Sequence, residues 1–332
     1  MYPRTAEIDS FDIRLISLLE EDARQTLSQM AKKLSSSQQV VSYRMKSLES
    51  KGIIGGYYSL LDIGKLGRTS YRTLLRLSNV NKETHSQIIT YLQKHPNVLW
   101  IVDCGGRWDL LVNFIAKNVV QYNKFLQDFR KEFPDNIQNY DVLITVEGVY
   151  FGRDYLVNSQ RKGKLLPKFG GQDHAIGEID EIDSGILRAM AEHGRINAVD
   201  IAERLKISPN TVILRLKSLR KRGILQSVKP LLHLEKIGFQ GYKALIKFQN
   251  TTEIKEKELF SYLYSKMFVA GILKMVGAWD FEIEFEVSSN EQMLQFVREL
   301  RDEFKEIIKE LEVLPLYHEY RYNFFPGDLI IS

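Results

Sequence analysis

Ile8-Asp9-Ser10-Phe11-Asp12, near the beginning of the chain, recurs as Ile179-Asp180-Glu181-Ile182-Asp183, with Asp9 and Asp180 lying 171 residues apart. The same offset continues without a gap through most of the 332 residues and relates Trp108-Asp109 to Trp279-Asp280. A register shared over so long a stretch indicates an internal duplication. Because the period is much longer than that of a solenoid repeat, each copy is expected to be a complete folding module.

The first third of each copy has the pattern of three short helices. In the first copy they begin after Asp9, Thr26 and Ser37, residue types that cap helix N-termini, and Gln29 stands at the capping-box position after Thr26. Apolar residues then recur at helical spacing, a glycine ends the third helix, and a short extended segment follows. The second copy repeats these features. This order predicts a winged helix-turn-helix with a hairpin as its wing.

The third helix of each module has two different faces. Val41, Met45 and Leu48 share one face and are expected to hold the helix to its module, as are their counterparts in the second copy. The other face carries polar and basic side chains that can reach phosphates or base edges. The residues expected to contact DNA are Ser37, Gln38, Gln39, Ser42, Tyr43, Arg44, Lys46, Ser208, Asn210, Thr211, Arg215, Lys217, Arg220 and Lys221.

The second copy differs at two of these positions. Ile213 and Leu214 stand where the first copy has Ser42 and Tyr43. These apolar residues could bury against another subunit, and the basic residues around them would then serve only as phosphate anchors. Contact with bases is therefore better supported for the first copy.

Charge is concentrated along the chain even though the net charge is only +4. Residues 204–229 hold eight Lys and Arg and no acid, and residues 24–51 hold six bases and one acid. By contrast, residues 282–312 hold ten acids and four bases. Positive charge confined to the helix-turn-helix indicates DNA binding more than it indicates an ordinary solvated helix face.

The rest of each copy has the pattern of a small α+β module. In the first copy, strands are expected at 71–77, 98–104, 108–116 and 141–150, and helices at 82–94 and around 122–129. In the second copy, strands are expected at 242–248, 269–276, 279–287 and 312–322, and helices at 252–267 and around 293–300. The order βαββαβ is that of a ferredoxin-like sandwich, with helices on one face of an antiparallel sheet. The other face needs a partner, either the second copy or another chain.

The fold class expected is therefore α+β, with two winged helix-turn-helix domains and two ferredoxin-like domains in tandem. The expected division is a first helix-turn-helix over 5–62, a first ferredoxin-like domain over 67–156, a linker over 157–177 that is partly ordered at Leu165-Leu166, a second helix-turn-helix over 178–233 and a second ferredoxin-like domain over 238–327.

These motifs resemble those of the Lrp/AsnC (feast/famine) transcription regulators. The resemblance rests on Ile-Asp-x-x-Asp, on the capped third helix, on the run from Arg44 to Ile54, and on a Gly-x-x-Asp turn in the second domain. It covers nearly the whole chain twice. It implies a tandem-fused DNA-binding regulator of a kind found in prokaryotes, especially archaea, whose second domain is a RAM, or ligand-sensing, domain. It also implies pairing through the RAM sheets and an amino-acid-like effector.

By position, the effector site of that family would fall at Gly106, Asp109, Gly277 and Asp280. Tryptophan precedes both aspartates, where smaller side chains or tyrosine are more familiar, and an indole could fill the pocket. The simpler interpretation, which we favour, is that the glycines allow a tight turn and the aspartates cap backbone N–H groups.

Enzyme signatures are weak. No glycine-rich phosphate loop, metal-ligand spacing or nucleophile elbow is found, and the six histidines are scattered, so no catalytic residue, metal or cofactor is expected. Glu282, Glu284 and Glu286 alternate on one strand and could form a catalytic or metal-binding row, but a solvent-facing stripe is the preferred interpretation. Siroheme decarboxylases have a similar fold, but the His-Asn-Tyr signature of that group is missing here. A third alternative is a ligand-binding or assembly protein that has lost DNA binding.

The compartment expected is a reducing cytoplasm. Cys104 is the single cysteine and cannot form an intramolecular disulfide. No apolar run is long enough to span a membrane, and the beginning of the chain lacks the apolar segment of a secretory signal.

Overall fold

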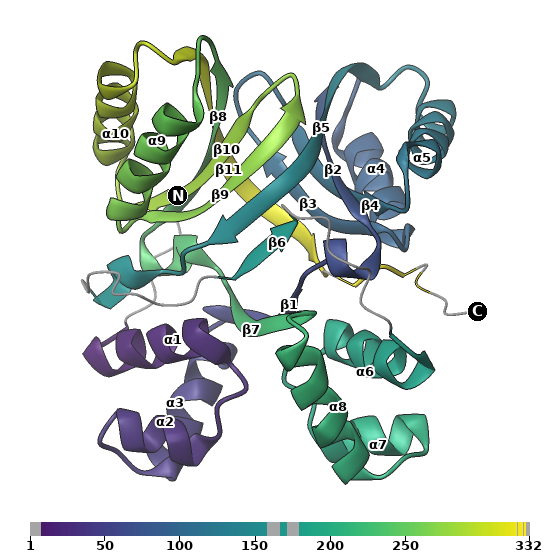
Figure 1. Ribbon diagram of the computed structural model, residues 1–332, viewed down its shortest axis with the longest axis vertical. Helices are drawn as coiled ribbons and strands as arrows, with labels where there is room; N and C mark the ends of the chain where they lie inside the picture. The colour runs from purple at the N-terminus through teal and green to yellow at the C-terminus, as the bar shows by residue number, and fades with distance from the viewer. Residues whose placement is uncertain (1–7, 158–166, 171–178, 324, 328, 330–332) are drawn as a thin grey trace.

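The computed structural model describes residues 8–157, 167–170, 179–323, 325–327 and 329, and its elements form two layers (Figure 1). One layer holds two three-helix units that lie side by side and are joined by a two-stranded ribbon. The other layer is a β-barrel with helices packed on its outside. Each copy of the repeat contributes one helical unit and one half of the barrel.

The first helical unit consists of α1 (Ser10–Asp22), α2 (Leu27–Lys33) and α3 (Gln38–Ser50). All three expected N-caps are confirmed. Asp9 and Thr26 each form a capping box, with Asp12 and Gln29 respectively, and the hydroxyl of Ser37 accepts a backbone N–H at the start of α3. Each such cap contributes about 1 kcal/mol to helix stability, so the three helix starts are encoded locally.

The second helical unit consists of α6 (Glu181–Glu192), α7 (Ala198–Leu205) and α8 (Pro209–Lys221). Its N-caps are the expected counterparts, Asp180, Asn197 and Ser208. Gly52 and Gly223 follow α3 and α8 with φ of 64° and 68°, a left-handed conformation that glycine adopts without steric cost. The two copies are therefore alike even in the backbone conformation at the ends of their third helices.

The expected wing hairpin within each unit was wrong. The strand after α3, β1 (Ile54–Leu61), pairs antiparallel with β7 (Leu225–Leu232), the strand after α8, and Tyr58 lies opposite Lys229. Each strand is largely buried because it is covered by the other copy, and a single hydrophobic cluster runs through both helical units. One shared ribbon takes the place of two separate wings, so the units are packed together rather than tethered.

Each copy then runs through the expected βαββαβ order. In the first copy the elements are β2 (Thr69–Leu77), α4 (Lys82–Lys94), β3 (Val98–Cys104), β4 (Leu110–Ala116), α5 (Val119–Glu132) and β5 (Ile137–Tyr150). In the second copy they are β8 (Gln240–Phe248), α9 (Glu253–Ser265), β9 (Val269–Gly277), β10 (Phe281–Val287), α10 (Asn290–Glu303) and β11 (Ile308–Tyr322). The short 3-10 helices η1 (Gly64–Leu66), η2 (Asp154–Val157) and η3 (Leu234–Ile237) connect the two layers.

The last strand of each copy belongs to both halves of the barrel. β5 pairs with β2 through residues 137–144 and with β9 of the other copy through 143–150. Likewise, β11 pairs with β8 through 308–315 and with β3 through 316–322. These exchanges close eight strands into a ring in the order β2-β4-β3-β11-β8-β10-β9-β5, and β6 (Lys168–Gly170) adds to β5. The two copies of one chain thus pair with each other.

Three hydrophobic clusters build the barrel layer. Two of them lie between the outside of the barrel and its helices, one under α4 and α5 and the other under α9 and α10. The third fills part of the barrel interior and includes all three tryptophans; Trp108 and Trp279, which precede Asp109 and Asp280, are 0% and 4% exposed. Such burial supplies the main favourable free energy of folding.

The expected linker falls mostly outside the described residues, Leu165-Leu166 included; Lys168–Gly170 within it form β6. Among the helices that the structure describes, none is long and apolar enough to cross a membrane.

Candidate nucleic-acid interface

The inner faces of α3 and α8 are apolar, as expected. Val41, Met45 and Leu48 are at most 6% exposed and belong to the cluster shared by the two helical units. In α8, Val212 and Leu219 are fully buried, and their neighbour Leu216 packs against the same cluster. Each helix is therefore held in a fixed rotation about its own axis, and this rotation decides which side chains face outward.

The outward face of α3 is formed by positions spaced three and four residues apart. Gln39, Tyr43 and Lys46 are exposed, Ser42 between them is half-buried, and Tyr43 retains 71% of its surface. The equivalent positions of α8 carry Asn210, Ile213, Leu214 and Lys217, all of them exposed. We call these two sets the outer face of α3 and the outer face of α8.

Arg44 does not belong to the outer face of α3. Its guanidinium lies 2.8 Å from the carboxylate of Asp9 and 3.3 Å from that of Asp12, at the start of α1. In the second copy, Arg215 makes the same contacts with Asp180 and Asp183, at 2.6 and 3.4 Å. Both arginines thus connect the third helix of their unit to the first, a role that the sequence pattern alone did not reveal.

These arginines also act on the capping aspartates. The backbone N–H of Asp12 and the guanidinium of Arg44 lower the pKa of Asp9. In the second copy, the backbone N–H of Asp183, together with Arg215, lowers the pKa of Asp180.

Several other residues expected at the interface have local partners. Ser37 and Ser208 accept backbone N–H groups as N-caps, and Thr211 shares a hydrogen bond of 2.8 Å with Ser208. Arg220 binds Asp22 of the other unit at 2.7 Å. Gln38 and Lys221 are exposed.

Contacts between the two helical units hold α3 and α8 at a defined separation. The Arg24 guanidinium donates to the carbonyls of Gly194 and Ile196, at 3.2 and 2.7 Å, and Arg195 reciprocates by donating to the carbonyl of Ala23. These bonds flank the β1–β7 ribbon and the shared core. The two outer faces are therefore carried by one rigid body rather than by two mobile domains.

The Gly-x-x-Asp turns of the barrel have backbone roles. The Asp109 carboxylate accepts the N–H of Leu77 at 2.7 Å, and the Asp280 carboxylate accepts that of Phe248 at the same distance. Gly106 and Gly277 adopt φ of 93° and 143°. These contacts agree with the interpretation that the glycines allow a tight turn and the aspartates cap backbone N–H groups. An effector site at these four residues stays a prediction.

The barrel interior holds a buried cluster of charges. Glu282 lies 3.3 Å from the guanidinium of Arg72 and 2.9 Å from the ammonium of Lys243, and Trp100 stacks near both cations. Burial alone would lower the pKa of Lys243, but Glu282 and Glu284 raise it above its ordinary value. Lys243 is therefore charged inside the barrel.

The interpretation of Glu282, Glu284 and Glu286 as a solvent-facing stripe was wrong. Glu282 and Glu286 are 0% and 1% exposed, and Glu284 is only partly exposed. The apolar residues that alternate with them on β10 pack under α9 and α10, so the glutamates point into the barrel. Because the strands close into a ring, the barrel interior is shielded from solvent.

A second buried cluster connects the barrel to the helical layer. Arg153, just after β5, binds Glu20 of α1 at 2.7 Å and Glu286 of β10 at 2.8 Å. Lys229 of β7 donates to the carbonyl of Glu20 at 2.8 Å, and Tyr155 donates to Glu286. The sequence signal for this cluster was Glu20 itself, a charged residue on the apolar face of α1, and it was overlooked.

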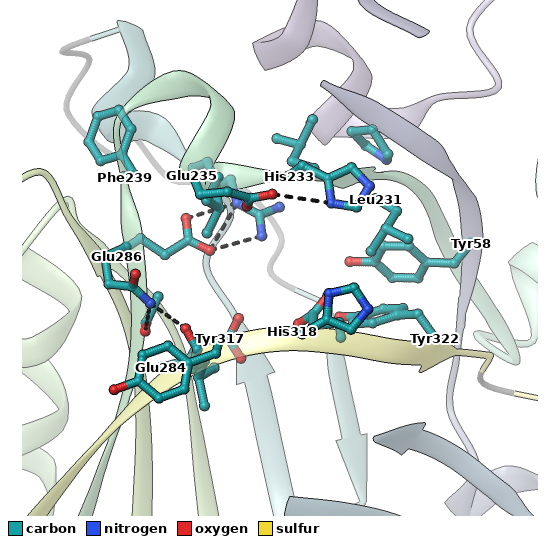
Figure 2. Close-up of a pocket in the computed structure, with 18 residues that line it drawn as sticks. Tyr58, Leu231, His233, Glu235, Phe239, Glu284, Glu286, Tyr317, His318 and Tyr322 are labelled. Carbon is teal, nitrogen blue, oxygen red and sulfur yellow. Dashed lines mark hydrogen bonds and ion pairs between the residues drawn. The ribbon is translucent and has the colours of Figure 1, made fainter. Parts of the chain in front are cut away.

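A cavity lies beside this cluster, between η3 and the second half of β11 (Figure 2). Its volume is about 90 Å³. Figure 2 shows His233 and His318 on its two sides, with Tyr58 and Tyr322 at one end and Glu284 and Glu286 at the other.

Comparison with known proteins agrees with the two helical units. The family described as winged helix-turn-helix DNA-binding matches residues 8–54 and 179–226. An uncharacterized HTH-type transcriptional regulator from Pyrococcus abyssi is 29% identical over 130 residues, 38% of this chain and 84% of that protein. The transcriptional regulator AzlB from Bacillus subtilis is 28% identical over 128 residues, 38% of this chain and 82% of that protein.

The whole chain is also similar in fold to a solved structure. The siroheme decarboxylase NirDL superposes with a TM-score of 0.60, covering 96% of this chain and 94% of that one, at 12% sequence identity. At this identity the likeness shows the fold alone. With two winged helix-turn-helix matches and HTH-type regulators among its relatives, the chain is similar to DNA-binding transcription regulators, in the tandem arrangement expected from its resemblance to the Lrp/AsnC proteins.

Proposed function

We propose that the chain is a sequence-specific DNA-binding transcription regulator whose recognition helices, α3 and α8, enter the major groove. The observation that carries this proposal is that both helices present an outer face at equivalent positions, each with a lysine, Lys46 or Lys217. Lysine binds phosphate, whereas Gln39, Ser42 and Asn210 can reach base edges. The concentration of basic residues in the helical layer supports the same assignment.

The rigid connection between the helical units specifies the form of the DNA site. One chain carries both recognition helices, so it would act as a pseudo-dimer on two half-sites about 34 Å apart, one helical turn of DNA. Because the two outer faces carry different residues, the two half-sites should differ in sequence. We further propose the domain division given above, with the helical units reading DNA and the barrel holding them together.

The DNA contacts of α8 rest on different chemistry from those of α3, because Ile213 and Leu214 cannot hydrogen-bond to bases. They can contact thymine methyl groups in the major groove, which allows apolar readout on a basic helix. The other interpretation, burial against another subunit, predicts that changes to these residues alter assembly and not base preference.

An amino-acid-like effector at Gly106, Asp109, Gly277 and Asp280 is a weaker part of the proposal. Both aspartates already accept backbone N–H groups, and both neighbouring indoles fill the barrel interior. A titration with the twenty amino acids that monitors DNA affinity would decide whether such an effector acts.

An enzyme of the siroheme decarboxylase type is the second candidate, favoured by the fold likeness over the whole chain. The cavity beside the Arg153 cluster, about 90 Å³, is smaller than the roughly 300 Å³ at which sites for drug-sized ligands begin, but a groove lined by Arg107, Trp279 and Arg301 measures about 540 Å³, so cavity volume does not decide against this candidate. Mixing the protein with siroheme and recording the Soret band and the products tests this directly. Turnover would overturn the assignment as a regulator alone.

Selection of bound fragments from genomic DNA tests the main proposal. We expect one enriched motif with two unequal half-sites, and an affinity that falls steeply with salt because phosphate contacts release counterions. Absence of any enriched motif, or an affinity insensitive to salt, would refute sequence-specific DNA binding.

A further inference from the structure

The two closing strands of the barrel differ in what lies along their outer edges. On β5, the residues Glu147–Val149 pair with β6, whose Gly170 lies opposite Glu147 and whose Lys168 lies opposite Val149. Gly170 also donates its N–H to Asp62 at 3.4 Å, next to η1. A short segment of the chain therefore adds to the first closing strand and reaches the connection to the helical layer.

The equivalent edge in the second copy carries no added strand in the part of the chain that the structure describes. Residues 318–320 of β11 correspond to Glu147–Val149 by the 171-residue offset. Glu319 among them pairs with Val102 of β3, and the carbonyl of Tyr320 accepts the side-chain amide of Gln93 at 2.9 Å. On the other side, beyond the first residues of β8, lies the cavity of Figure 2. Its wall includes His233, the counterpart of Asp62, and Glu235, the counterpart of Gly64, which contacts Gly170. The cavity thus stands where β6 lies in the first copy.

The wall of the cavity is acidic. Its only Lys or Arg is Arg153, which is already paired with Glu20 and Glu286. Four glutamates line it: Glu235, Glu284, Glu286 and Glu319. Glu284 is paired with Lys243 at 2.5 Å and Glu286 with Arg153, so Glu235 and Glu319 are the two without a lysine or arginine partner among the described residues. The counterparts of Glu284, Glu286 and Glu319 in the first copy are Asn113, Ile115 and Gly148, so the acidity is specific to the second copy.

We propose that the edge of β11 beside this cavity binds an extended peptide that adds as a strand, displaces the side-chain amides of Gln93 and Gln240 from the β11 carbonyls, and places a basic side chain beside Glu235 and Glu319. β6 provides the geometric precedent, and it carries Lys168 at its first paired position. Main-chain hydrogen bonds to a strand edge give such peptides affinity, and the side-chain pocket gives specificity. The occupant would be a basic segment of a partner protein, and it would touch both the barrel and η3 of the helical layer. The proposal does not depend on DNA binding.

The test uses a fluorescein-labelled peptide with the sequence of residues 166–171, Leu-Pro-Lys-Phe-Gly-Gly, titrated with the full chain and followed by fluorescence anisotropy. We expect one peptide to bind per chain. Replacing its lysine by glutamate should weaken binding by roughly tenfold or more, since like charges then meet in the cavity. N-methylation of the peptide backbone should also abolish binding, because it removes the N–H donors that a strand needs.

Two protein variants locate the site. The Cβ of a side chain at Gly241 would lie 3.8 Å from Leu234 and Leu316, so Gly241→Leu fits the backbone and fills the cavity. It should abolish peptide binding with an unchanged thermal unfolding midpoint. Glu319→Gln should weaken binding, whereas Glu147→Gln, which removes a carboxylate from the occupied edge of β5, should not.

Three results would overturn the proposal. The first is no binding of the peptide to the wild-type chain. The second is equal binding of the N-methylated peptide, which excludes strand addition. The third is competition by n-butylamine at the same concentration as the peptide, which would indicate a site for a small cation instead.

Discussion

Arg72 and Lys243 stand at equivalent positions of the two copies, and both place their charge against the same carboxylate, Glu282, at 3.3 and 2.9 Å. The counterpart of Glu282 in the first copy is Leu111. Two first copies paired with each other would therefore bury two arginines with no carboxylate at this place. Because an unpaired buried charge is costly, the barrel interior favours the pairing of unlike copies within one chain.

Removal of this shared carboxylate should destabilise the barrel. Glu282→Gln leaves Arg72 buried without its counterion, whereas Lys243 keeps Glu284 at 2.5 Å, and breaking a buried ion pair costs about 3–5 kcal/mol. Urea unfolding followed by circular dichroism measures the loss. A double variant with Arg72→Met and Glu282→Leu should recover most of it, since Arg72 is then gone together with its carboxylate and Lys243 stays paired with Glu284. A single variant as stable as the wild type would contradict the role given to Glu282.

Lys46 and Arg44 should have separable effects. Lys46→Ala should weaken DNA binding uniformly across sequences and reduce the slope of log affinity against log salt by about 1, without changing the unfolding midpoint. Arg44→Ala should lower the unfolding midpoint, because it leaves Asp9 and Asp12 without their cation. Anisotropy titrations and thermal unfolding distinguish the two. Lys257→Ala, on the exposed side of α9 in the barrel layer, is the control and should change neither.

Thymine methyl groups should matter in one half-site and not in the other. Replacing thymine by deoxyuridine removes the methyl group alone. Where that methyl group packs against Ile213 or Leu214, its removal should cost about 0.8 kcal/mol, about fourfold in affinity. A variant with Ile213→Ser and Leu214→Tyr, which installs the residues of the first copy, should not show this sensitivity. If unmodified DNA binds while deoxyuridine has no effect in either half-site, apolar readout by α8 is wrong and DNA binding still stands.

Acid should weaken the connection between the two layers. Burial alone would raise the pKa of Glu20, but Arg153 and Lys229 hold it below its ordinary value near 4.5. The unfolded chain therefore binds more protons in that range, so the free energy of unfolding is highest above pH 4.5 and falls as the pH drops toward the lowered pKa. Glu20→Gln should flatten this dependence in urea titrations between pH 6 and pH 3. Glu253→Gln, at an exposed carboxylate, should keep the wild-type profile.

Much of the fold and part of the site could be predicted from local patterns. Helix starts at Asp9 and Ser37 were encoded by side chains that cap the neighbouring N–H groups, and the buried face of α3 followed from its 3.6-residue period. The position of Arg44 could not be predicted this way, because its partner Asp12 lies 32 residues away, on another helix.

The sequence by itself determined the duplication, the order of helices and strands and the rotation of each recognition helix, because these depend on residues within a few positions of one another. Only the tertiary structure decided which strands pair across the copies. It joined β1 to β7, exchanged β5 and β11 between the halves of the barrel, and turned Glu282 inward. The physical reason is that the alternation of residue types along a strand shows which residues share a face of the sheet. It contains no information about which strand is the hydrogen-bonded neighbour, and that neighbour is decided when the strands close into a ring.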